Sequence, residues 1–264
     1  MGERGAAVAV RVGAVSSLLG RASAAAEPTE LVVAPVELHR RNLQRRLREA
    51  RAPKDAFAFV DAPAVAKAVL DAAGERSRPI DRIDRLSLCR SALAADAVDV
   101  PRRLRGDAEG MPQVVEQVRG EVESVTNFHP ARVEAFEATA DGLYEPVDAD
   151  ARDVLDVALD AERALRERTP KAVSDTALVR RATRLLAATA GEAWTDAYPN
   201  IERVSLVGVS SVSAPQADLL GVLADETDAA VTVYARRGTG SYLEARLPSL
   251  LDVAEPGAEV FERR

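Results

Sequence analysis

The sequence predicts an α/β protein that combines a parallel sheet with a large helical insertion. Short apolar runs without alternation, as expected of strands covered on both faces, occur at residues 31–35, 204–209 and 230–234. Between the first and second runs, residues 80–198 carry apolar side chains at helical spacing. The strand, helix and strand that follow one another over residues 204–234 are typical of a parallel sheet.

The first part of the chain predicts three strands and two helices. Residues 8–12 alternate weakly and predict a first strand, residues 31–35 end at a proline, and residues 56–60 predict a third strand. Residues 36–52 predict a helix, because leucines recur there at helical spacing. Asp61 is expected to cap the next helix, which has a proline in its first turn and ends at a glycine.

The middle of the chain is predicted to be helical, and strands return after it. The predicted helices cover residues 80–95, 112–126, 130–140, 148–168 and 174–198. The best strand of the chain, residues 204–209, is expected to lie at the centre of the sheet, and a helix over residues 215–227 leads to the last strand. We therefore expect a sheet domain made of residues 1–79 and 199–264, interrupted by a helical insertion at residues 80–198.

Net charge, cysteine content and the length of apolar runs limit the class of protein and the partners that we expect. The 264 residues include 35 basic and 42 acidic side chains, and the net charge of −7 argues against a surface covered in nucleic-acid contacts, although a local basic face is compatible with it. Cys89 is the only cysteine and is expected to be a buried thiol, so no intrachain disulfide can form. No apolar run approaches the roughly 20 residues of a spanning helix, so we expect a cytoplasmic protein that makes no membrane contact.

The sequence predicts neither a metal site nor a cofactor. His39 and His129, the only histidines, have no cysteine cluster near them. The serines that follow the strand at residues 204–209 lack the second glycine of a Gly-x-Ser-x-Gly elbow. We therefore name no catalytic residue, and an enzyme whose site the sequence does not reveal stays open as one alternative.

The end of the strand at residues 204–209 lacks a residue that nucleotide hydrolases need. In a P-loop ATPase, an acidic residue at such a strand end holds Mg²⁺. Gly208 and Ser210 stand at the end of this strand, and the helix after it begins near Gln216. These three residues are therefore candidates for a degenerate Mg²⁺ site.

The segment after the first strand is the candidate for a degenerate phosphate loop. It contains Gly13, Gly20, Arg21 and Ser23, with Gly20-Arg21 roughly where a phosphate loop has Gly-Lys. The spacing from Gly13 is too long, and arginine replaces the compact lysine ammonium poorly. We expect no ATP hydrolysis, and two alternatives remain open for the segment: anion binding at a helix N-terminus or an ordinary strand–helix turn.

Residues 204–220 resemble one segment of AddB-type helicase–nuclease subunits of the RecB family, in which a strand leads through a small turn to a Ser/Thr-Pro-Gln helix start. The order of elements over residues 30–240 fits the same proteins. The resemblance implies a RecA-like, P-loop-type sheet with an inserted helical subdomain, as in the N-terminal region of an inactivated superfamily 1 helicase. The sequence departs from AddB-type subunits in lacking their phosphate loop, and we expect it to have no nuclease domain.

This resemblance implies a non-catalytic helicase-like scaffold in DNA recombination or repair. Its expected partners are single-stranded DNA, a helicase or nuclease subunit, or both. The loop and helix after the second strand would contact DNA, with a histidine stacking on a base and arginines neutralising phosphates. The candidate contacts are His39, Arg40, Arg41, Arg45 and Arg48, with a second basic patch at Arg102 and Arg103.

Two alternatives to DNA binding remain open for these residues. A run of arginines on a helix is also typical of a solvated face whose charges are answered by neighbouring acids. The second alternative is that the protein is a cytoplasmic α/β interaction or regulatory protein that is unrelated to DNA.

Overall fold

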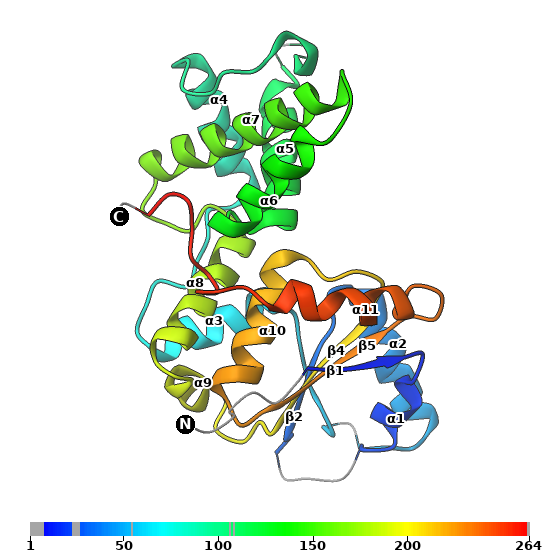
Figure 1. Ribbon diagram of the computed structural model, residues 1–264. Coiled ribbons are helices and arrows are strands. Elements are labelled where there is room, and N and C mark those ends of the chain that lie inside the picture. The colour runs from blue at the N-terminus through cyan, green and yellow to red at the C-terminus, as the bar shows by residue number, and fades with distance from the viewer. Residues whose placement is uncertain (1–7, 23–26, 54, 106, 108, 263–264) are drawn as a thin grey trace.

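The computed structural model describes residues 8–22, 27–53, 55–105, 107 and 109–262. The described chain forms two lobes (Figure 1). We call residues 80–173, which contain helices α4 to α7, the helical lobe, and the rest of the chain the sheet lobe.

The sheet lobe contains five parallel strands in the order β1-β5-β4-β2-β3. The strands are β1 Ala9–Val12, β2 Glu30–Val33, β3 Ala58–Val60, β4 Arg203–Val209 and β5 Ala230–Ala235. Strand β4 is central, since Val204 is paired with Leu31 on one side and with Val231 on the other. The expected α/β class and the central position of β4 are therefore confirmed.

Helices cover both faces of the sheet. On one face lie α1, Val15–Leu19, and α2, Glu37–Glu49, whose buried leucines pack against Val32, Val207 and Tyr234. The other face is covered by α3 Ala62–Ala72, α8 Asp175–Ala188, α9 Glu192–Ala197, α10 Ala214–Glu226 and α11 Gly240–Leu251. Apolar residues thus line both sides of the strands, which explains why the strand sequences do not alternate.

The predicted helix at residues 174–198 is two helices. Helix α8 ends at Ala188, and the chain turns through Gly191, whose φ is +80°. A Cβ atom at this glycine would lie 2.0 Å from the carbonyl oxygen of Glu226, so the turn requires glycine. Helix α8 and helix α9 pack against α3 of the sheet lobe, although their residues were predicted to belong to the helical insertion.

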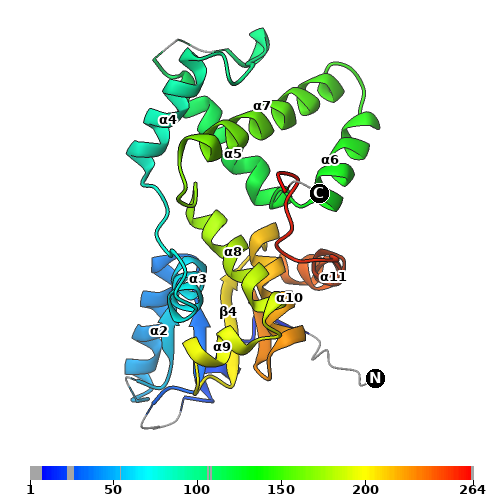
Figure 2. The ribbon, with the colours of Figure 1, turned by 90° about the vertical axis from the view of Figure 1, so that its left-hand side faces the viewer.

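The helical lobe is built from α4 Arg82–Ala94, a short 3-10 helix at Arg102–Leu104, α5 Met111–Thr126, α6 Pro130–Asp141 and α7 Val147–Arg168. Helix α5 packs against α4, α6 and α7 (Figure 2). Cys89 is buried between them, and burial raises the pKa of its thiol to about 12. The expected buried thiol is confirmed, and at neutral pH it is protonated and unreactive.

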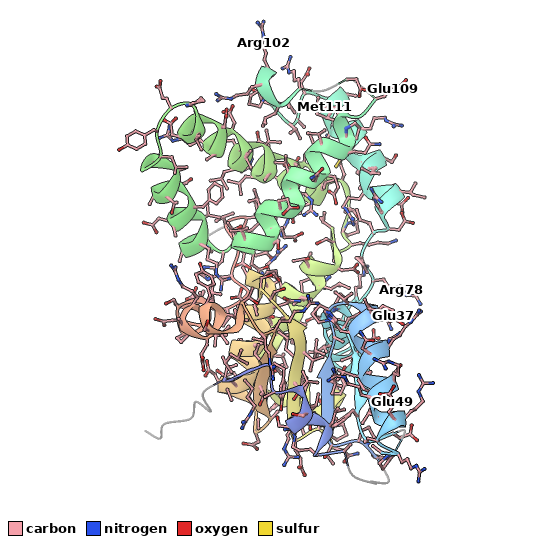
Figure 3. The ribbon with its side chains drawn as sticks, turned by 90° about the vertical axis from the view of Figure 1, so that its right-hand side faces the viewer. Glu37, Glu49, Arg78, Arg102, Glu109 and Met111 are labelled. Atoms are coloured by element: carbon pink, nitrogen blue, oxygen red, sulfur yellow. The ribbon has the colours of Figure 1, made fainter. Side chains whose placement is uncertain are left out.

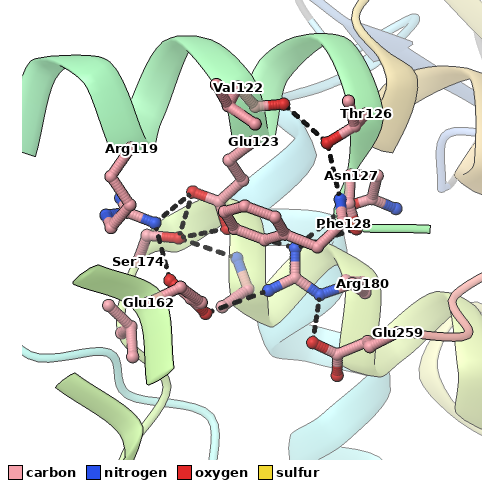
Figure 4. Close-up of polar contacts among 12 residues, drawn as sticks. Arg119, Val122, Glu123, Thr126, Asn127, Phe128, Glu162, Ser174, Arg180 and Glu259 are labelled. Carbon is pink, nitrogen blue, oxygen red and sulfur yellow. Dashed lines mark hydrogen bonds and ion pairs between the residues drawn. The ribbon is translucent and has the colours of Figure 1, made fainter. Parts of the chain in front are cut away.

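A buried network of ion pairs joins the two lobes (Figure 4). Arg119 of α5 contacts Glu123 and Glu162, both at 2.9 Å, and Arg180 of α8 contacts Glu123 at 3.1 Å. The Nε atom of Arg180 lies 2.9 Å from Glu259 near the C-terminus. Each of these side chains is at most 5% exposed, so the charges depend on one another for compensation.

The segment after α11 crosses from the sheet lobe to the helical lobe (Figure 1). Its Val260 N–H donates to the carbonyl oxygen of Phe128 at 3.0 Å, and the rings of Phe261 and Phe128 lie 5.4 Å apart. Arg132 of α6 pairs with Asp218 of α10 at 2.6 Å. These contacts place the helical lobe beside the first turns of α10, which follow the carboxyl end of β4.

None of the described helices combines the length and the apolarity needed to cross a bilayer.

Candidate functional site

The carboxyl end of β1 does not lead into a phosphate loop. Gly13, whose N–H donates to the carbonyl oxygen of Ala235 at 2.9 Å, is followed by only one residue before α1 begins at Val15. The side chain of Arg237 covers Gly13, because a Cβ atom there would lie 2.5 Å from the arginine Cγ. The turn is therefore too short and too filled to wrap phosphates.

The other residues of the predicted phosphate loop lie elsewhere. Gly20 ends α1, and the next residue, Arg21, pairs with Glu30 at 2.6 Å and donates to the hydroxyl of Tyr234 at 2.9 Å. Glu30 is the first residue of β2, so Arg21 is held at the amino end of that strand. Ser23 lies outside the described residues. The structure therefore does not bring Arg21 together with Gly13.

The end of β4 is occupied by a histidine and an arginine. Gly208 has a φ of +72°, and a Cβ atom there would lie 2.7 Å from Nδ1 of His39, so the imidazole ring packs directly on the glycine. The guanidinium of Arg236 donates to the carbonyl oxygen of Gly208 at 2.9 Å and contacts Nε2 of His39. Ser210 is exposed beyond the strand, and the side chain of Gln216 accepts a hydrogen bond from a backbone N–H at the start of α10.

These contacts assign the charge state of His39. Burial, together with the nearby charge of Arg236, lowers the pKa of the imidazole, so His39 is neutral at pH 7. Because Nε2 accepts from Arg236, the proton belongs on Nδ1. Nδ1 is buried and has no hydrogen-bond acceptor among the described residues. His39 therefore offers a donor without a partner.

A cavity of about 220 Å³ opens beside this histidine. It lies between α2, the start of α1 and the end of β4. Its lining residues are Val15, His39, Asn42, Leu43, Arg45, Arg46, Val207 and Gly208. An open α/β sheet binds its ligands at the carboxyl ends of its strands, and this cavity occupies that position.

Helix α2 runs from Glu37, beside the helical lobe, to Glu49 at the far end (Figure 3). Its exposed side carries arginines. Part of this positive charge is compensated within the helix, since Arg41 pairs with Glu37 at 2.9 Å and Arg45 pairs with Glu49 at 2.7 Å. Arg40 also pairs with Glu37, and the hydrogen bonds from Arg40 and Arg41 lower the pKa of that carboxyl. Exposed pairs of this kind are weak and open readily to a competing anion.

Among the arginines of α2 and of the end of β5, four have no carboxylate partner in the described part of the chain. They are Arg46, Arg48, Arg236 and Arg237, of which the first two lie on α2 and the last two follow β5. Helix α2 and the end of β5 therefore form one basic surface, which we call the α2 face.

The second predicted basic patch is remote from the α2 face. Arg102 lies at the far end of the helical lobe from α2 (Figure 3). Its neighbour Arg103 pairs with Asp150 at 3.1 Å and also contacts Asp153. The structure therefore does not join the two patches, and it gives Arg103 acidic partners of its own.

A comparison with protein families gave a match to the model of the Halobacterial UvrD-like protein family over residues 3–262. The chain belongs to the Halobacterial UvrD-like protein family. The helicase relation expected from residues 204–220 is thereby supported, and it points to UvrD-like proteins rather than to the AddB and RecB type specifically. A comparison with curated proteins gave no match.

The sequence reasoning missed part of the α2 face of this UvrD-like protein. Arg236 and Arg237 were not singled out, although they directly follow a strand whose carboxyl end must meet that of β4. The parallel pairing of β4 and β5 brings Arg236 to Gly208 and His39. A basic pair just after a predicted strand was the available signal.

Proposed function

We propose that this UvrD-like protein is a non-catalytic, helicase-like scaffold that binds single-stranded DNA through the α2 face, in recombination or repair. A helicase or nuclease subunit is the protein partner that such a scaffold would serve. The observation that carries the proposal is the gathering of arginines along α2 and at the end of β5 in a chain of net charge −7. Positive charge concentrated on one face of an acidic protein favours a polyanionic ligand.

The distribution of acidic residues supports this assignment. The helical lobe, residues 80–173, contains 20 acidic and 13 basic side chains. This excess of seven acidic side chains equals the net charge of −7 of the whole chain. The α2 helix has five arginines against two glutamates. A DNA strand would therefore be attracted to α2 and repelled by most of the helical lobe.

The fold supports the helicase part of the proposal. We assign the sheet lobe to a RecA-like core and the helical lobe to an inserted subdomain, with the insertion running from about residue 80 to residue 173 rather than to 198. The reason for the shorter range is that α8 and α9 pack on α3 and α10 in the sheet lobe.

We expect no ATP hydrolysis above background, with or without DNA. The turn after β1 has no lysine, and the end of β4 has a glycine under His39 where a hydrolase would hold Mg²⁺. Release of inorganic phosphate from ATP, measured with and without oligonucleotide, checks this. Release of phosphate above background that DNA stimulates would contradict it.

Reversing two charges of the α2 face should weaken DNA binding. We expect the double variant Arg41→Glu/Arg45→Glu to bind single-stranded DNA more weakly and with a flatter salt dependence. Each lost phosphate contact removes about 0.7 from the slope of log affinity against log salt for a single strand. Fluorescence anisotropy of a labelled oligonucleotide across a salt series measures both quantities.

A matched control separates a local effect from the change in net charge. Arg82→Glu/Arg90→Glu makes the same charge change at exposed positions of α4 in the helical lobe. We expect this control to keep most of the affinity and the slope. If the wild type shows no salt-dependent binding even at low ionic strength, the DNA proposal is wrong, and the arginines form a solvated face.

A further inference from the structure

A second cavity flanks α2 at the end that lies away from the helical lobe. Its volume is about 500 Å³, and it lies between the last turns of α2 and the edge strand β3. Its lining residues are Gln44, Leu47, Arg48, Ala52, Asp55, Phe57 and Phe59. The same helix thus borders both cavities, the first near its start and the second near its end.

The inner wall of this cavity is aromatic and apolar. The rings of Phe57 and Phe59 lie edge to face, 6.2 Å apart and at 87°. Phe57 is buried, whereas Phe59 is only half-buried. The chain has only five phenylalanines, so two of them at one open cavity are a notable concentration. Edge strand β3 has no further strand beyond it in the described chain, which leaves this wall accessible.

The rim of the cavity is polar. Gln44, Arg48 and Asp55 are exposed, and each lines the opening. The guanidinium of Arg48 donates to the carbonyl oxygen of Gln44 at 3.4 Å and has no carboxylate partner among the described residues. An apolar interior with a few polar groups at its edge is typical of a small-ligand site.

We propose that this cavity receives the planar base of a nucleotide, with Phe59 against the ring and Arg48 on the adjoining phosphate. An aromatic side chain stacks on any base, because every base has a π-face, and an arginine beside it neutralises the phosphate. The side-chain amide of Gln44 and the carboxylate of Asp55 supply hydrogen-bonding groups for the edge of the base. This inference rests on the proposed function and specifies how the strand is held.

The position of the cavity fits a strand that runs along α2. His39 and Arg48 are nine residues apart, which corresponds to about 14 Å along a helix. A strand of several nucleotides would reach from the first cavity, beside His39, to the second. A base inside a duplex is stacked and paired, so it enters such a cavity only after it is unpaired. The second cavity, which we call the base pocket, therefore favours single-stranded over double-stranded DNA.

The experiment compares two labelled ligands of equal length, an oligo(dT) and the same strand with abasic sugars throughout. Both carry the same phosphates, so only contacts to the bases distinguish them. We expect the wild type to bind oligo(dT) more tightly. We expect Phe59→Leu, which keeps an apolar side chain without a ring, to weaken oligo(dT) binding by about 5- to 100-fold and to leave abasic binding unchanged. Phe59→Tyr keeps the ring and should keep the affinity.

Two further measurements complete the test. Arg48→Gln, a change at an exposed position, should weaken binding of both strands, and thermal unfolding checks that each variant is folded. Competition by free dTMP shows whether the cavity binds a mononucleotide or a base that belongs to a DNA strand. If dTMP binds and the oligonucleotide does not, the base pocket stands as a mononucleotide site and the DNA proposal falls.

The outcomes separate failure of the inference from failure of the proposed function. Equal binding of the two strands, unchanged by Phe59→Leu, would overturn the base pocket while the α2 face remains a phosphate-binding surface. If neither the strands nor dTMP binds, both proposals are wrong.

Discussion

Glu162→Ala should lower the free energy of unfolding by about 3–5 kcal/mol, the cost of removing one partner from a buried ion-pair network. Glu162 has a fully buried side chain and accepts hydrogen bonds from Arg119 at 2.9 Å and from Arg166 at 2.8 Å. Its loss would leave the charge of Arg119, whose side chain is 2% exposed, with less compensation. Equilibrium unfolding in urea measures the change.

The matched control for this prediction lies on the same helix. Glu167 of α7 is exposed and has no ion-pair partner in the described part of the chain. We expect Glu167→Ala to change the stability by no more than about 0.5 kcal/mol, as is usual for surface substitutions. An equally small effect of Glu162→Ala would show that the network does not hold the lobes together.

Glu259→Gln should destabilise the protein by about 3 kcal/mol at pH 7, and this difference from the wild type should shrink as the pH falls. Burial raises the pKa of Glu259, but the opposing charges of Arg180 and Arg166 outweigh it and lower the pKa from 4.5 to about 2. A shift of this size corresponds to about 3 kcal/mol, since one pKa unit equals about 1.4 kcal/mol. Its side chain is only 5% exposed, so solvent screens this interaction little.

The sign of the pH dependence follows from the direction of the shift. Because the pKa is lower in the folded than in the unfolded state, the stabilisation is complete above about pH 4.5 and is lost as the pH falls towards 2. Unfolding curves at pH 7, 4 and 3 for the wild type and for Glu259→Gln isolate this contribution. Glu262→Gln, in the same segment and half-exposed, is the control for the lost charge, and we expect it to change the stability by no more than about 0.5 kcal/mol at pH 7. A constant difference at all three pH values would count against the ion pairs of Glu259.

Much of the sheet could be predicted from local sequence. The runs that became β2, β4 and β5 are apolar without alternation, which is the pattern of strands covered on both faces, and Asp61 caps α3 as expected. The break between α8 and α9 could not be predicted, because it depends on the close approach of Gly191 to Glu226, which is distant in sequence. Helix α11, which covers part of the sheet, was also missed.

The candidate site was predictable only in part. The arginines of α2 are evident as a run, but their use depends on tertiary contacts, such as the packing of His39 on Gly208. Arg21 was misplaced, because sequence spacing alone does not reveal that it turns back to Glu30. The ion-pair network was not predicted at all, since Arg119, Glu162 and Glu259 come from separate parts of the chain and look like ordinary surface charges in the sequence.

Photo-cross-linking to single-stranded DNA tests the central claim most directly. An oligonucleotide containing 5-iodouracil is irradiated with the wild-type protein, and mass spectrometry locates the modified peptides. We expect cross-links within residues 36–60, which include α2, His39 and Phe59, and near Arg236 at the end of β5. Cross-links confined to the helical lobe, for example around Arg102, or no cross-link under conditions in which a known single-strand-binding protein reacts, would contradict binding along α2.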